Sequence, residues 1–282
     1  MGAGRIDHVA MRSPARRFLP FVLSATLLAL LGPVGAAANP AALTSAVMLD
    51  TELQALGLIN AQRTARGLVA VRLDTRLADI ARSRAGYMGR TGDFDHVQSG
   101  GVTVFDLIAA RRITWYGAGE IIAWNTAADA GESAAMAVRQ WMTSPTHKAI
   151  IISKAYNYAA FGMAVSATTG RRYFAGVFLK GPDRTGAWAK VTSVTTAPVD
   201  ALRARVQLRW AGSDTRLQVL TAGFRYFEIQ RRSPGGAWRS YGTTTTTSAT
   251  RTWTQGLTYE FRVRARDRAG NWGAWRTISI TP

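Results

Sequence analysis

The sequence predicts an α+β domain followed by an all-β sandwich, and the boundary between them is a change of hydrophobic period. Before about residue 180, apolar residues recur at helical spacing in several segments and alternate in others. From about residue 188 to residue 282 the period is two throughout, which indicates strands alone. Between the two patterns lies a polar stretch with proline and glycine. We therefore expect domains over residues 39–181 and 190–282, joined by a linker over residues 182–189.

The first domain is expected to contain helices followed by two strands. The expected helices cover, in order, residues 49–67, 74–88, 102–111 and 128–143. Pro145 is expected to break the last helix just before His147. Strands are expected near residues 161–165 and 173–179. The second of these is apolar on both faces, as in a central strand that helices cover on each side.

The second domain is expected to be an immunoglobulin-like sandwich with arginine on its solvent faces. Apolar residues alternate with arginine over residues 202–210 and again over residues 261–266. The outward arginines would be Arg203, Arg205 and Arg209 on one strand and Arg262, Arg264 and Arg266 on another. If these strands lie in different sheets, the domain has two cationic faces.

The last third of the chain carries most of the excess charge. Residues 187–282 have 15 basic and 5 acidic side chains, a net charge of +10 out of +18 for the whole chain. Such faces attract anionic wall polymers, acidic lipid headgroups or nucleic acid, of which the last is rarely met by an exported protein. The alternative is a solvated surface that is rich in arginine through composition alone.

Residues 1–38 have the pattern of a signal peptide. Arginines precede an apolar run over residues 18–31, and Ala36 to Ala38 supply small residues for cleavage. The run is short for a membrane span, although an uncleaved anchor is the alternative. We expect a secreted protein. The chain has no cysteine, which excludes disulfides, cysteine-ligated zinc and thiol catalysis.

Two histidines and a glutamate are the candidate site. Outside the signal segment the histidines are His96 and His147, both beside polar turn residues, and Glu120 lies between them in the sequence. Two imidazoles and a carboxylate suit Zn²⁺ or another divalent metal, with a position left for water or a ligand. The chain has no closely spaced ligand pair, so the fold alone would have to bring these groups together.

Two other interpretations of the same residues stay open. The three groups can form a structural hydrogen-bond cluster on a cleft floor. They can also serve a hydrolase, in which Ser144, three residues before His147, or Ser99, three residues after His96, is the nucleophile. Serine near a helix end is more often a cap, and a complete nucleophile, base and orienting group is not evident. We therefore expect binding rather than catalysis.

Residues 53–180 resemble the CAP superfamily of cysteine-rich secretory proteins, venom antigens and plant pathogenesis-related proteins, in its bacterial, cysteine-free branch. The resemblance is carried, in order, by residues 58–63, Gly67-Leu68, Leu73-Asp74 with Leu77 and Ala81, Phe94-Asp95-His96, Gly119-Glu120, Trp141 to His147, and Phe161-Gly162-Met163. It implies an α-β-α sandwich with a cleft lined by His96, Glu120 and His147. Ser144 stands where many members have a second acidic residue, and Ile121 where an asparagine is usual. Three of the four family groups are thus present.

The C-terminal 95 or so residues resemble a fibronectin type III module. Trp210 matches the early core tryptophan, residues 257–259 resemble the tyrosine corner, and residues 267–275 fit the ending common in bacterial copies. The CAP resemblance further permits a small or apolar ligand such as a lipid, and Trp124 beside Glu120 is a candidate to line its groove. We therefore expect an extracellular binding protein whose basic sandwich is a spacer or a surface-adhesion module.

Overall fold

The computed structural model describes residues 40–282, with side chains from Leu49 onward. The expected signal peptide, residues 1–38, lies outside the described residues. Within the described chain, no helix combines the length and the apolar character that crossing a membrane requires.

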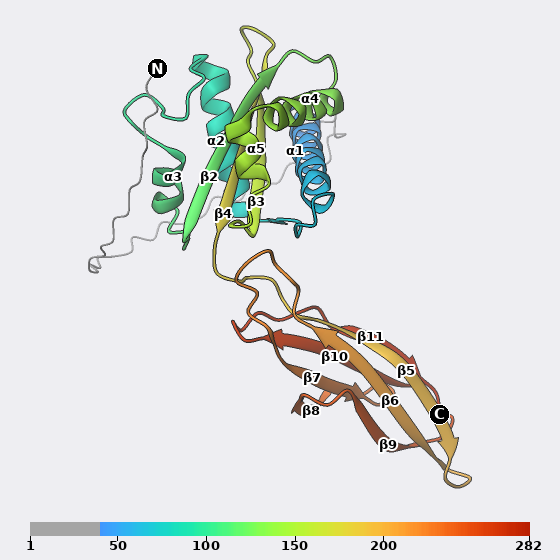
Figure 1. Ribbon diagram of the computed structural model, residues 1–282. Coiled ribbons are helices and arrows are strands. Elements are labelled where there is room, and N and C mark those ends of the chain that lie inside the picture. Colours follow the sequence, from blue (N-terminus) through green and yellow to red (C-terminus); the bar gives the residue numbers. More distant parts are fainter. Residues whose placement is uncertain (1–39) are drawn as a thin grey trace, which may run out of the picture. The chain divides into compact units, whose positions relative to one another are not determined.

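The first part of the described chain is a sheet with helices on both faces (Figure 1). The helices are α1 (Pro40–Thr64), α2 (Thr75–Thr91), α3 (Val104–Ala110), α4 (Ala130–Thr143) and α5 (Pro145–Ile151). The strands are β1 (Arg72–Leu73), β2 (Gly117–Asn125), β3 (Tyr158–Val165) and β4 (Arg172–Lys180). Helices α2 and α3 pack on one face of the sheet, and α1, α4 and α5 pack on the other. This is the three-layer α-β-α arrangement that the resemblance implied.

The sheet has the order β1-β3-β4-β2. Strand β4 lies inside the sheet and is buried on both faces, which confirms the prediction for residues 173–179. Strand β2 is one edge, paired with β4 alone, and the sequence analysis did not predict it. Its buried residues do not alternate, because both faces of the strand are covered.

Side chains from neighbouring elements close the free edge of β2. The Trp141 indole N–H donates to the Ile122 carbonyl at 2.8 Å, and the Gln140 amide donates to the Trp124 carbonyl at 3.2 Å. The Tyr156 hydroxyl donates to the Ala118 carbonyl at 3.2 Å. Carbonyls that would accept another strand are therefore already satisfied, which is one way to prevent edge-to-edge pairing.

Ser144 joins two helices, and the second of them, which contains His147, was not predicted. Ser144 ends α4 and is also the N-cap of α5, and Pro145 occupies the first turn of α5. Pro145 therefore starts a helix rather than only ending one, because the first helical position needs no backbone N–H. His147 lies in the first turn of α5.

Helix α2 packs directly against the backbone of β3 at Gly162. A Cβ on Gly162 would lie 2.2 Å from backbone atoms of Ala81 and Arg82. Gly162→Ala is therefore expected to force α2 away from the sheet and to lower the free energy of unfolding by about 1–3 kcal/mol or more. Urea denaturation measures this loss.

Gly57→Ala is the matched control, since a Cβ at this position in α1 meets nothing within 4 Å. Alanine also has the higher helix propensity, so this variant should be unchanged or more stable by up to about 1 kcal/mol. Equal stability of the two variants would contradict the close approach of α2.

The C-terminal part, residues 188–282, consists of two antiparallel sheets, here called the β module. Its strands are β5 (Trp188–Pro198), β6 (Arg203–Ser213), β7 (Phe224–Arg232), β8 (Arg239–Thr244), β9 (Ser248–Thr254), β10 (Tyr259–Asp267) and β11 (Arg276–Ile280). One sheet has the order β11-β10-β7-β8 and the other β5-β6-β9. Inward residues of both sheets form one core that contains Trp210. The Tyr259 hydroxyl accepts from the Thr254 backbone N–H at 3.2 Å, a tie to the backbone like that expected of a tyrosine corner.

Candidate functional site

The fold brings the three candidate residues together from distant parts of the sequence. His96 lies in the loop after α2, Glu120 in β2 and His147 in α5. The His96 Nδ1 atom lies 2.8 Å from Glu120 Oε2, and the ring centres of His96 and His147 are 6.0 Å apart. The Glu120 side chain is 3% exposed, whereas that of His96 is 50% exposed. The carboxylate is thus buried, whereas His96 lies at the protein surface.

Arg84 is a fourth member of this cluster, and the sequence analysis missed it. Its Nε atom lies 2.6 Å and its Nη2 atom 3.2 Å from the two oxygens of Glu120. Nη2 also donates to the Asp95 carbonyl at 2.6 Å, next to His96. The Arg84 side chain is fully buried. A sequence signal existed, because Arg84 shares the buried face of α2 with Leu77 and Met88.

This pairing determines how His96 presents its ring. Arg84 neutralises the charge of Glu120, and because the ionised carboxylate can only accept, the His96 Nδ1–H group donates a hydrogen bond to it. In the neutral imidazole the lone pair is then on Nε2. A carboxylate that fixes the histidine tautomer in this way is a common second partner of metal-binding histidines.

Glu120 was expected to be a metal ligand, but both of its oxygens already have partners in the protein. Among residues 40–282, three ligand atoms within 4.8 Å of one another occur at Asp183, Asp214 and Asp267, and His96, Glu120 and His147 do not form such a group. Both Glu120 oxygens are engaged by Arg84 and His96. The two imidazoles, rather than Glu120, are therefore the groups that could hold a metal, and Glu120 would orient the ring of His96.

The cluster of Asp183, Asp214 and Asp267 lies apart from the two histidines. Asp214 and Asp267 belong to the β module, and Asp183 lies in the segment just before it. Each carboxylate oxygen accepts a hydrogen bond, from backbone N–H groups or the Asn271 amide. Burial raises the pKa of Asp214, and the charges of Asp183 and Asp267 raise it further. The three carboxylates hold the loops together by these bonds.

His147 is expected to be neutral at pH 7. Burial lowers its pKa from the ordinary value, and the neighbouring His96 lowers it further. His96→Ala should remove the second cause and raise the pKa of His147 part of the way back, which NMR titration of the ring protons measures. The depressed pKa means that His147 contributes stability above about pH 6.5, lost as the pH falls. An unchanged His147 titration in His96→Ala would show that the rings do not interact.

A groove of about 530 Å³ is lined by residues of β2 and α4 and by His147 of α5. Trp124, Ser144 and His147 line it as expected, whereas His96 and Glu120, which were also expected in the cleft, are not among its lining residues. The sequence analysis did not identify the other lining residues: Phe94, Ile122, Ala123, Asn125, Thr126, Met136, Gln140 and Trp141. Most of this lining is apolar, and His147 is one of its polar members. Trp115 and Tyr116, which precede Glu120 in the sequence, are not among the lining residues, and Trp115 stacks on Phe105 instead.

Ser144 is a helix cap rather than a partner of an imidazole. Its Oγ atom lies 3.5 Å from the His147 backbone N and 3.1 Å from Thr146 Oγ1. Within the described chain, neither Ser144 nor Ser99 is hydrogen-bonded to a histidine ring. The serine, histidine and carboxylate arrangement that nucleophilic catalysis needs is therefore absent from the described residues in this conformation.

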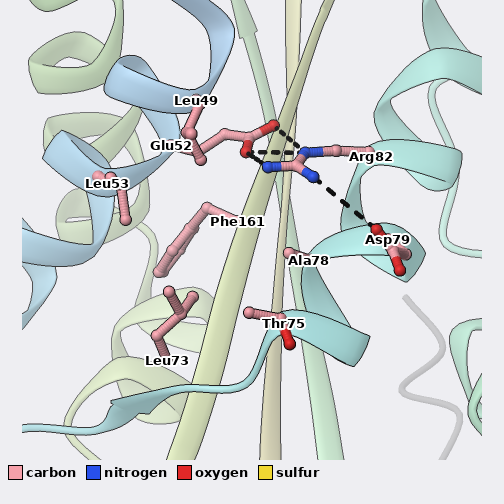
Figure 2. A pocket seen from close by; sticks show the side chains of 9 residues that line it. All are labelled: Leu49, Glu52, Leu53, Leu73, Thr75, Ala78, Asp79, Arg82 and Phe161. Carbon is pink, nitrogen blue, oxygen red and sulfur yellow. Dashed lines mark hydrogen bonds and ion pairs between the residues drawn. The ribbon is translucent and has the colours of Figure 1, made fainter. Parts of the chain in front are cut away.

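A second, smaller hollow of about 140 Å³ lies between α1 and α2 (Figure 2). The buried Glu52 carboxylate pairs across it with Arg82, and Leu49, Leu53 and Leu73 are partly exposed at its rim. The Glu52 Oε1 atom also accepts from the Met163 backbone N–H at 3.4 Å. The ion pair thus ties both helices to β3, and we interpret the hollow as part of the packing between them.

A three-layer domain with two histidines over a buried carboxylate is the kind of domain that the CAP resemblance predicts. Residues 56–178 match the family described as CAP: Cysteine-rich secretory protein family, and this part of the chain is a CAP family domain. No curated protein matches the chain.

Solved structures that the chain is similar to include an outer surface protein from Borrelia burgdorferi, 20% identical, with a TM-score of 0.40, covering 45% of this chain and 89% of that one. An extracellular protein containing an SCP domain from Bacillus anthracis is 20% identical, with a TM-score of 0.42, covering 53% of this chain and 45% of that one. A cysteine-rich secretory protein from Staphylococcus aureus is 17% identical, with a TM-score of 0.37, covering 46% of this chain and 39% of that one. The matched region is thus under half the length of the last two chains.

Proposed function

We propose that the CAP domain binds a divalent metal ion between His96 and His147. Two imidazole nitrogens are donors that suit Zn²⁺. The adjoining groove would hold a small or apolar ligand. The observation that supports this most is the chain from Arg84 through Glu120 to His96. It fixes the ring so that Nε2 can bind a metal, next to a histidine whose pKa burial and His96 have lowered. Two protein ligands leave positions open for water or for a donor atom of the ligand.

We further propose that the protein works outside the cytoplasmic membrane and that the β module is a fibronectin type III-like sandwich for spacing or surface adhesion. The signal-peptide pattern of residues 1–38 and the excess of basic side chains in residues 187–282 support this proposal. The tie between Tyr259 and Thr254 and the common core of the two sheets are in keeping with such a sandwich.

Calorimetric titration with Zn²⁺ tests the metal site. The unmodified protein should bind with a dissociation constant in the micromolar range, and His96→Ala and His147→Ala should each abolish binding. Thr143→Ala is the control, because Thr143 is exposed and its hydroxyl bonds the Gln140 carbonyl of its own helix; it should bind normally. Absence of binding, with both histidine variants less stable by about 1–3 kcal/mol, would mark the histidines as structural.

The competing function is a hydrolase that uses the same cleft. It requires a reactive serine, which a fluorophosphonate probe would label in the unmodified protein and not in Ser144→Ala. The capping position of Ser144 argues against this outcome. A purely structural protein would show neither labelling nor zinc binding.

A further inference from the structure

The two rows of arginine in the β module have different surroundings. Arg262, Arg264 and Arg266 of β10 stack with tryptophans: Arg262 lies 4.0 Å from the Trp238 ring centre and Arg264 lies 3.9 Å from that of Trp272. Arg264 is also paired with Glu228 at 2.6 Å. These guanidinium groups are partly buried and already engaged, so this row is a structural stack rather than a free cationic surface.

The arginines of β6 lie on the other sheet and remain exposed. Arg205 and Arg209 point outward from the middle of the sheet β5-β6-β9, between two other strands. No strand of this sheet contains an acidic residue. Within the described chain, neither arginine has an acidic partner, while Arg203 at the end of the row pairs with Asp200. The positive charges of Arg205 and Arg209 are therefore not neutralised by acidic side chains of this sheet.

Hydroxyl groups flank this row in register. On β9, Thr254, Thr252 and Ser248 are the direct neighbours of Arg203, Arg205 and Arg209. On β5, Ser193 is the neighbour of Arg209, and Thr195 is that of Gln207 between the arginines. Residues directly opposite on neighbouring strands have Cβ atoms about 4.5–5.5 Å apart, so one bound group can touch both.

We propose that the outer face of the sheet β5-β6-β9 binds a linear polymer with a phosphodiester backbone. The cations lie in a line along β6, which favours an extended chain that runs along the strand. A phosphate has two free oxygens that diverge, so it can accept from a guanidinium group and from a hydroxyl on the neighbouring strand. A carboxylate held by a guanidinium fork has both oxygens in the plane of the fork, which leaves only their outer lone pairs for a hydroxyl on the neighbouring strand.

This assignment deepens the proposed adhesive role of the β module and rests on it. The sequence analysis allowed two cationic faces, but only the β6 face remains free, because the β10 arginines stack on tryptophans and Arg264 pairs with Glu228. The metal site of the CAP domain is not required for it, so the two proposals fail separately.

The test measures binding of the full chain to poly(glycerol phosphate) over a range of NaCl concentrations. Arg205→Gln combined with Arg209→Gln should weaken binding at 0.15 M NaCl at least tenfold. It should also reduce the slope of log K against log salt by about 1.4, as two lost phosphate contacts predict. Arg239→Gln combined with Arg276→Gln removes the same charge from exposed positions on the other sheet and should change affinity less than twofold.

Equal losses in the two double variants would overturn the proposal, because binding would then follow net charge and not this face. If polygalacturonate bound as tightly as poly(glycerol phosphate) or more tightly, the ligand would be a carboxylate polymer and the proposal would be wrong. If phosphatidylglycerol vesicles did so, the ligand would be a lipid surface and the proposal would also be wrong. No binding of poly(glycerol phosphate) would also overturn it. Zinc titration of Arg205→Gln/Arg209→Gln should be normal, and His147→Ala should bind the polymer normally, which separates the two proposals.

Discussion

Arg84→Met is expected to lower the free energy of unfolding by about 3–5 kcal/mol, because it leaves the Glu120 carboxylate buried without its cation. Both side chains are almost fully buried, so water cannot replace the lost partner. The variant also loses the bond from Arg84 to the Asp95 carbonyl, which holds the loop that carries His96. Urea denaturation measures the loss of stability, and zinc affinity should fall in the same variant.

Two controls show whether the cost comes from the unpaired charge. Arg90→Met, on the exposed side of the same helix, should change stability by no more than about 0.5 kcal/mol. Arg84→Met combined with Glu120→Leu removes both charges and should recover much of the stability, since an apolar pair of similar size often replaces a buried ion pair without loss. If Arg84→Met were as stable as Arg90→Met, the pair would not organise the cleft.

The sequence predicted most of the CAP domain because its signals are local. Asp74 caps the start of α2, and Gly67 follows the end of α1 with a left-handed backbone conformation. The sequence analysis recognised both signals. The family spacing also placed His96, Glu120 and His147 in one cleft, and the structure brings them together. These predictions needed only the neighbouring residues or the order of short motifs.

Features that depend on tertiary contacts were missed. Strand β2 shows no alternation, because helices and loops cover both of its faces. The partner of Glu120 is 36 residues away in the sequence, and only the packing of α2 on the sheet brings Arg84 to it. Ser144 was recognised as a possible cap, but the sequence could not show that Pro145 starts a further helix that contains His147.

The arginine rows illustrate the same limit. Alternation correctly predicted that both rows point away from the core and that they could lie on different sheets. It could not show that Trp238, Trp272 and Trp275 fold over one row. The ion pair between Arg264 and Glu228 likewise joins two strands that are distant in the sequence.

Trp141→Ala is expected to cost about 3–5 kcal/mol, as the loss of a fully buried tryptophan usually does. The indole packs against Phe161 and Phe174, with ring centres 5.8 and 6.4 Å away, between α4 and the sheet. A cavity there would loosen the wall of the groove as well as the core. Thermal or urea denaturation measures the loss.

Trp141→Phe separates the packing of this side chain from its hydrogen bond. Phenylalanine keeps most of the apolar contact but leaves the Ile122 carbonyl without its donor, which should cost about 1–3 kcal/mol. If the indole also protects the edge of β2, this variant should self-associate more than the unmodified protein, and sedimentation velocity would detect it. A monomeric Trp141→Phe variant would assign the protection to Gln140 and Tyr156, whose side chains bond the other carbonyls of that edge.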